Sequence, residues 1–271
     1  MRSWHCSCYS PDIPSDTVKI MPRLRSLLSA LLATGALAVS APGHAASVRV
    51  TFDTPIFNGS GSDNVRITYP GGSASVAAGR FQGTASNLVG VSPSIFVNGV
   101  DDLFMYCYDV YENVGNGWKV DYTINFTGVG ARTLDFLGAV NAALSGGGET
   151  DPFAWLRPTS RFQGAAIQLG IWESLYESAP AWDLGAGAFR ASDLDTGTRE
   201  WWDIFRGRID SSDTLAAKYT MTLQAKGAQD MITGDPPGEV PEPASLALVG
   251  LGLLALTALG LRPRRPARRR V

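Results

Sequence analysis

The sequence predicts a mainly β fold with a helical insertion (an α+β fold), built as a β-sandwich or barrel and followed by a C-terminal transmembrane helix. Short segments in which apolar and polar residues alternate fill the first half of the chain between glycine-rich turns, which is typical of strands. The apolar spacing then changes to a helical period, and a strand pattern returns near residue 220. The segment 244–261 contains no charged residue.

Residues 21–46 have the layout of a secretory signal peptide. Two arginines precede an apolar run over 27–39, and small residues at Gly43 and Ala45 mark an expected cleavage site. Residues 1–20 are polar, and we interpret them as a gene-model extension ahead of the second methionine. Both histidines lie before the expected cleavage site. We therefore expect a mature chain with no histidine-based catalytic or metal site, no cofactor and no enzymatic activity.

The expected strands lie in the first part of an ectodomain over residues 47–232. They cover 47–57, 65–69, 73–81, 95–97, 103–111 and 118–126. In the last of these, alternate residues are apolar and predict one buried face: Trp118, Val120, Tyr122, Ile124 and Phe126. Asn98-Gly99 indicates a hairpin-type turn after 95–97.

The helical insertion follows these strands. Helices are expected over 132–144, 162–177 and 197–209, with a glycine-rich hairpin over 183–189 and a closing strand over 219–225. Proline and glycine in residues 233–240 indicate a linker.

The charge distribution argues against a nucleic-acid partner. Residues 47–261 hold 13 of the 23 Lys and Arg residues but 23 of the 25 Asp and Glu residues. Phosphate binding needs a clustered basic face, which an acidic body does not offer.

The end of the chain combines three features. Pro241-Glu242-Pro243 is followed by the uncharged segment 244–261, which would span roughly 27 Å as a helix, close to the thickness of a bilayer core. A basic tail then holds that end in the cytoplasm by the positive-inside rule; its arginines are Arg262, Arg264, Arg265, Arg268, Arg269 and Arg270.

These three features together resemble the PEP-CTERM sorting signal over residues 241–271. The resemblance implies an exported protein that uses the secretion machinery and is held in the inner membrane by its C-terminal helix. It also implies processing by exosortase, a membrane transpeptidase, and a final place at the cell surface or outside the cell. Such proteins occur in bacteria that make exopolysaccharide, which is therefore an expected partner.

Cys107 is the one cysteine that follows the expected signal peptide. A cysteine without a partner in an exported chain is a buried inert thiol, part of an intermolecular disulfide, or the site of another covalent bond. Gln168 is the polar exception in an apolar helical segment, and a buried amide is costly unless it is hydrogen-bonded. Either residue is also explained by ordinary packing.

The segments around Cys107 and Gln168 resemble the thioester domains of bacterial surface adhesins. Tyr106-Cys107 followed by an aromatic residue, and Gln168 followed by Ile171-Trp172, stand in the family's order. The resemblance implies an internal thioester between Cys107 and Gln168 that an amine on a surface partner opens. Trp172 would exclude water, and Asp109 would assist as a base from the same strand face.

Two alternatives use no thioester. The first is a structural or carbohydrate-associated matrix protein, in which some of the tryptophans stack on sugars: Trp118, Trp155, Trp182, Trp201 and Trp202. The second is a glycosidase that uses two carboxylates, for which Asp101, Asp102 and Asp109 are candidates without a distinguishing spacing.

Overall fold

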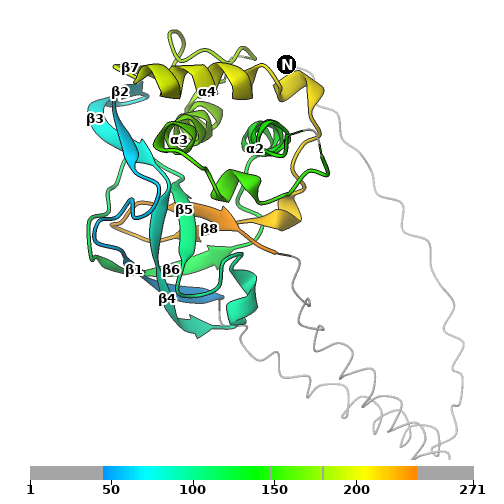
Figure 1. Cartoon of the computed structure of the whole chain (residues 1–271). Helices are drawn as coiled ribbons and strands as arrows, with labels where there is room; N and C mark the ends of the chain where they lie inside the picture. Colours follow the sequence, from blue (N-terminus) through cyan, green and yellow to red (C-terminus); the bar gives the residue numbers. More distant parts are fainter. Residues whose placement is uncertain (1–44, 147, 179, 237–271) are drawn as a thin grey trace, which may run out of the picture. The chain divides into compact units, whose positions relative to one another are not determined.

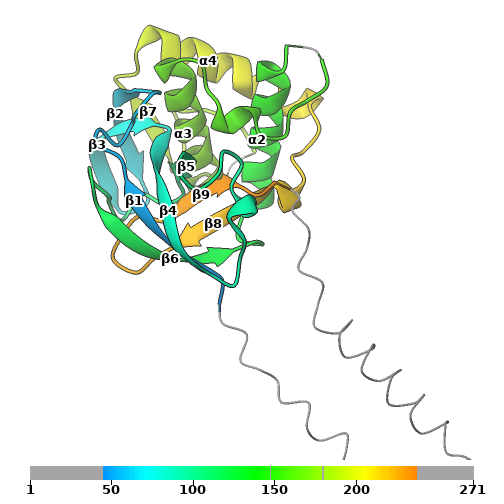
Figure 2. The ribbon, with the colours of Figure 1, turned by 60° about the horizontal axis from the view of Figure 1, so that its bottom comes forward.

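The computed structural model describes residues 45–146, 148–178 and 180–236, and a closed antiparallel barrel forms their centre. Its strands neighbour one another in the order β1-β4-β5-β9-β8-β6 (Figure 2). Their bounds are Ser47–Phe52 (β1), Phe81–Val89 (β4), Leu103–Cys107 (β5), Lys119–Asn125 (β6), Thr220–Gln224 (β8) and Met231–Gly234 (β9). The barrel, rather than the sandwich, is thus the observed form of the predicted β fold.

Strand β1 buries one face in the core and pairs closely with β4. Its residues alternate between buried and half-buried positions, with Val48, Val50 and Phe52 in the core. Opposite Phe52, strand β4 places Gly83, where an added Cβ would lie 2.6 Å from the carbonyl oxygen of Thr51. Glycine therefore permits the two backbones to approach closely at this point.

Three helices lie between β6 and β8 in the chain and pack on one side of the barrel (Figure 1). They are α2 (Ala131–Leu144), α3 (Arg161–Tyr176) and α4 (Thr196–Arg206). Helix α3 is the central one, because it contacts α2, α4 and strands of both sheets. The Ser160 side chain accepts a hydrogen bond from the Gln163 N–H and caps the start of α3.

A second, three-stranded sheet flanks α3 in the order β3-β2-β7. Its strands are Ser62–Tyr69 (β2), Gly72–Gly79 (β3) and Arg190–Ser192 (β7). Four short 3-10 helices complete the described elements: Pro93–Ile95 (η1), Ala154–Leu156 (η2), Ile209–Ser211 (η3) and Ala217–Tyr219 (η4).

Several predicted elements differ from the observed ones. The expected strand over 95–97 is a 3-10 turn followed by a bend, and residues 183–189 form turns without paired strands. The helix expected over 197–209 ends at Arg206. Strands β4 and β9 were not predicted, and β9 extends to Gly234, beyond the ectodomain end expected at residue 232.

The apolar face predicted for the strand over 118–126 is buried only in its middle. Tyr122 and Ile124 are buried, but Trp118 and Phe126 are 46% and 39% exposed at the two ends. Trp118 and Phe126 flank the strand on either side, beyond the part that packs on the core, so both side chains reach solvent.

Candidate functional site: the Cys107–Gln168 contact

The structure brings Cys107 and Gln168 together through a pair of hydrogen bonds. The Cys107 backbone N–H donates to Gln168 Oε1 at 2.9 Å, and Gln168 Nε2 donates to the Cys107 carbonyl oxygen at 2.9 Å. Both residues are buried, Gln168 completely. The Gln168 amide therefore binds the backbone of Cys107, the residue with which the thioester resemblance pairs it.

The strand pairing explains why Cys107 accepts a side chain in this place. The register of β4 along β5 ends with Phe81 opposite Met105, so β4 provides no pairing residue for Cys107. On its other edge, β5 continues against β9, with Cys107 opposite Met231. Gln168, projecting from α3, completes the ladder where β4 falls short, and this satisfies backbone groups that burial would otherwise penalise.

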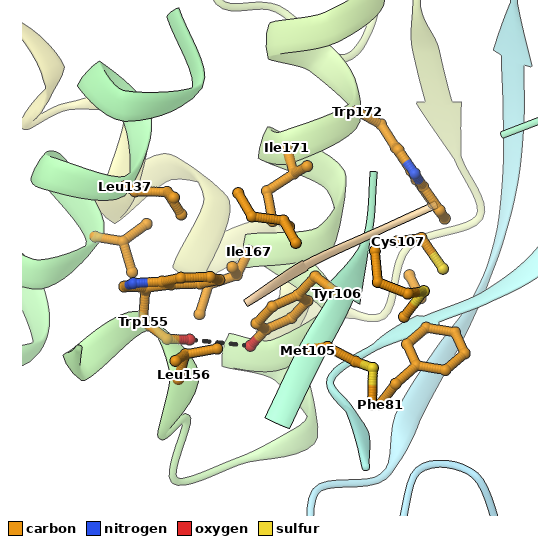
Figure 3. Close-up of a cluster of buried hydrophobic side chains, with 14 of the residues drawn as sticks. Phe81, Met105, Tyr106, Cys107, Leu137, Trp155, Leu156, Ile167, Ile171 and Trp172 are labelled. Carbon is orange, nitrogen blue, oxygen red and sulfur yellow. Dashed lines mark hydrogen bonds between the residues drawn. The ribbon is translucent and has the colours of Figure 1, made fainter. Parts of the chain in front are cut away.

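The Cys107 side chain lies in an apolar environment. Figure 3 shows it on the same side of β5 as Met105 and Phe81, whereas Tyr106 points the other way and stacks on Trp155. Burial raises the pKa of the Cys107 thiol well above its usual value, and the charge of Asp109 raises it further. The thiol is therefore neutral at ordinary pH.

Asp109 does not lie on the strand face from which it was expected to act as a base. Strand β5 ends at Cys107, so Asp109 lies in the following loop rather than on the same strand face. Its carboxylate accepts hydrogen bonds from the backbone N–H groups of Tyr111, Glu112 and Asp230. These bonds hold the loop, and the carboxylate charge disfavours a thiolate at Cys107.

Trp172 lies beside this loop. Its indole N–H donates to the Asp109 carbonyl oxygen at 3.1 Å, and the side chain is 2% exposed. Two residues that the sequence analysis did not single out complete the arrangement. Gln229 Nε2 donates to the same oxygen at 2.9 Å, and the Val110 N–H donates to the Tyr176 hydroxyl at 3.1 Å. Tyr176 follows Trp172 by one helical turn, which is the signal that would have found it.

Together these contacts fix the segment 108–112 against α3. Glu173, next to Trp172 in the chain, is directed elsewhere: its Oε1 accepts from the Asp183 N–H at 3.1 Å.

The sorting residues predicted at the C-terminus lie outside the described part of the chain, as do the expected signal peptide and membrane helix. Within the described residues, no helix is long and apolar enough to cross a membrane, and no group of three acidic, cysteine or histidine side chains is placed to hold a metal ion.

Comparison with known protein families decides the role of the chain's end. Residues 239–265 match the PEP-CTERM protein-sorting motif. The chain is an exported protein that exosortase sorts, and this C-terminal signal anchors it in the membrane before cleavage. Searches of curated proteins and of solved structures gave no match. The PEP-CTERM match covers only the tail, so the activity of the barrel has to be inferred from the residues of the barrel itself.

Proposed function

We propose that this PEP-CTERM protein is a covalent adhesin whose ectodomain carries an internal thioester between Cys107 and Gln168. The observation that carries the proposal is the paired hydrogen bonding of the Gln168 amide to the Cys107 backbone. Both residues are buried, so the Cys107 thiol and the Gln168 amide share an environment that excludes water.

The contacts around Gln168 suit acyl transfer. Attack by sulfur on the Gln168 carbonyl carbon places negative charge on Oε1, which already accepts a hydrogen bond from the Cys107 N–H. A backbone N–H aimed at such an oxygen stabilises the tetrahedral intermediate. The hydrogen bond from Nε2 to the Cys107 carbonyl oxygen orients the leaving nitrogen.

The reaction balances without a further reagent. The S–C bond forms, the C–N bond of the amide breaks, and the thiol proton leaves with the nitrogen as ammonia. A primary amine on a partner surface then attacks the thioester carbonyl, releases the Cys107 thiol and leaves an amide between the partner and Gln168.

Gln168 is fully buried, so an incoming amine reaches it only after a local opening of the structure. The segment 108–112 follows Cys107 directly, and its hydrogen bonds to Trp172 and Tyr176 are the contacts that we expect to open. The same burial would protect the thioester from hydrolysis by excluding water.

The alternative is an inert thiol beside a structural glutamine, since the same two hydrogen bonds satisfy the buried amide. Intact mass separates the two. We expect the full-length protein to be lighter than its calculated mass by one ammonia and to gain one methylamine on incubation with that amine. We expect the Cys107→Ala variant to show neither change.

Gln163→Glu supplies a matched control, because Gln163 lies on the same helix outside the cluster. This variant should keep the ammonia deficit. A wild-type protein at its full calculated mass, with a thiol that reacts after denaturation, would contradict the thioester and leave the sorted matrix protein as the better description.

A further inference from the structure

A hollow of about 320 Å³ lies at the N-terminal end of α3, away from the Cys107–Gln168 contact. It is lined by the end of α2, the 3-10 helix η2, the start of α3 and one residue of α4. The volume is at the lower end of the range of roughly 300–1,000 Å³ that is typical of small-molecule sites. Its lining includes Trp201, Asp151, Arg157, Thr159 and Gln163.

Gln163 carries a buried amide group that faces this hollow. The residue is 5% exposed, and its Oε1 accepts hydrogen bonds from both the backbone N–H and the hydroxyl of Thr159, at 2.6 and 3.0 Å. The backbone N–H is only a donor, which fixes the oxygen on that side. Nε2 must then point the other way, and it donates to none of the described residues. A donor that no described residue uses, on a side chain that is otherwise buried and lines the hollow, is available to a ligand there.

The charged residues of the hollow neutralise each other. Arg157 Nη1 lies 2.9 Å from Asp151 Oδ2, and Arg157 Nε donates to Asn98 at 3.4 Å. These contacts hold the guanidinium and the carboxylate in place while leaving the site with no net charge. Neither an anionic nor a cationic ligand gains a long-range attraction here.

Trp201 supplies an aromatic wall. Its indole is half-buried, and its ring centroid lies 5.4 Å from that of Phe205, which restrains it. The other tryptophans considered as sugar platforms do not line this hollow. Trp155 and Trp202 are buried in the core, and Trp118 is exposed at the start of β6.

We propose that this hollow binds a neutral sugar unit of a saccharide chain. A pyranose ring offers an apolar C–H face for the indole and a rim of hydroxyl groups that both donate and accept. The Gln163 amide, the Asp151 carboxylate and the Arg157 guanidinium are the fixed planar groups that would pair with this rim. The site is separate from the proposed thioester and would hold the protein on a glycan without a covalent bond.

The test is binding of neutral disaccharides (cellobiose, maltose and lactose) to the full-length protein in a phosphocholine detergent, which has no sugar head group. Saturation-transfer NMR and calorimetry measure the binding. We expect at least one of the three to bind, and digalacturonate to bind at least about ten-fold more weakly, because the lining has no net charge.

Two variants localise the binding. Gln163→Glu keeps the acceptor that Thr159 uses and removes the Nε2 donor, and Trp201→Ala removes the aromatic wall; each should weaken binding about ten-fold or more. Trp118→Ala removes an exposed indole outside the hollow and should leave affinity unchanged. Thermal unfolding of each variant shows that the fold is retained, and Gln163→Glu decides the outcome if Trp201→Ala does not fold.

Three results would overturn the proposal: no binding of any neutral disaccharide at millimolar concentration, equal loss in Trp118→Ala and Gln163→Glu, or stronger binding of digalacturonate. Binding that persists in Cys107→Ala would show that the hollow acts independently of the thioester. The two proposals therefore fail or succeed separately.

Discussion

At the scale of single residues, the contact between Gln168 and Cys107 combines a structural and a chemical role. The amide replaces a missing strand partner, and this accounts for a polar side chain in α3, the most buried of the described helices. The sequence indicated both residues, because a lone cysteine and an isolated glutamine each stand out from their surroundings. It did not indicate that the glutamine would bind the cysteine backbone, because that depends on where β4 stops.

The strand-face position expected for Asp109 was wrong for a similar reason. Its position two residues after Cys107 placed it on the same face only if the strand continued. The chain instead turns after Cys107, where backbone N–H groups need an acceptor, and the carboxylate fills that need. Alternation in sequence cannot show where a strand ends.

Glu173 gives a prediction for pH dependence. It is fully buried, its Oε2 has no hydrogen-bond partner among the described residues, and burial raises its pKa to about 7. The hydrogen bond from the Asp183 N–H and the charge of Arg132 on α2 oppose the shift, and the charges of Glu177 and Asp183 add to it. Between pH 4.5 and 7 the unfolded chain releases this proton while the folded chain keeps it. Stability is therefore fully present below pH 4.5 and falls as the pH rises to 7.

Glu173→Gln should remove this contribution while keeping the acceptor for Asp183. Denaturant unfolding at pH 4.5 and pH 7 should show a loss of stability in the wild type that exceeds the loss in the variant by about 2–3 kcal/mol. Glu200→Gln changes an exposed carboxyl on α4 and should behave as the wild type. Identical pH profiles for the wild type and Glu173→Gln would show that Glu173 does not titrate in this range.

At the scale of elements, helix α3 holds two glycines in different surroundings. A Cβ at Gly170 would overlap the Phe136 ring of α2, whereas a Cβ at Gly164 would meet its nearest neighbour at an ordinary 3.5 Å. Gly170→Ala should therefore destabilise the protein by about 1–3 kcal/mol by pushing the two helices apart. Gly164→Ala should be neutral or stabilise by up to about 1 kcal/mol, because alanine favours the helix. Equal midpoints of unfolding for the two variants would contradict the close packing of α2 on α3.

The elements that the sequence analysis missed share a physical cause. Strand β4 turns Phe81, Gly83 and Ala85 into the core, so two of its three buried residues are too small to give an apolar signal. Strand β9 has four residues and ends in glycine. Both segments are strands because they pair with strands on either side in the barrel, and no local sequence pattern reveals this pairing. The long helices and β6, with their stronger patterns, were predicted close to their true bounds.

At the scale of the whole molecule, the fold class, with a barrel as one of its two expected forms, and the sorting tail were predicted, and the order of the strands was not. Barrel closure depends on pairing between β5 and β9, strands separated by more than 120 residues. Sequence patterns identify strands that lie on a core but do not say how they are ordered. The tail, in contrast, is a local signal that can be read without the fold.

The sorting motif gives a prediction for the fate of the chain. Replacing Pro241, Glu242 and Pro243 with alanine should block processing in cells that contain exosortase, because these residues lie in the segment that matches the sorting motif. The protein should then stay in the membrane fraction and retain a C-terminal epitope tag. Replacing Pro236 and Pro237 with alanine serves as the control and should leave processing unchanged. Loss of the tag from the triple variant would show that another sequence directs cleavage.

The position of β9 in the barrel has a consequence for the order of events during secretion. This last strand inserts between β5 and β8, so the barrel stays open, with two unpaired edges, until residue 234 has crossed the membrane. Only residues 235–240 separate that strand from the sorting motif. Because the sorting signal anchors the chain in the membrane before cleavage, we expect the barrel to close while the chain is still held there, which would keep its unpaired edges away from those of other chains.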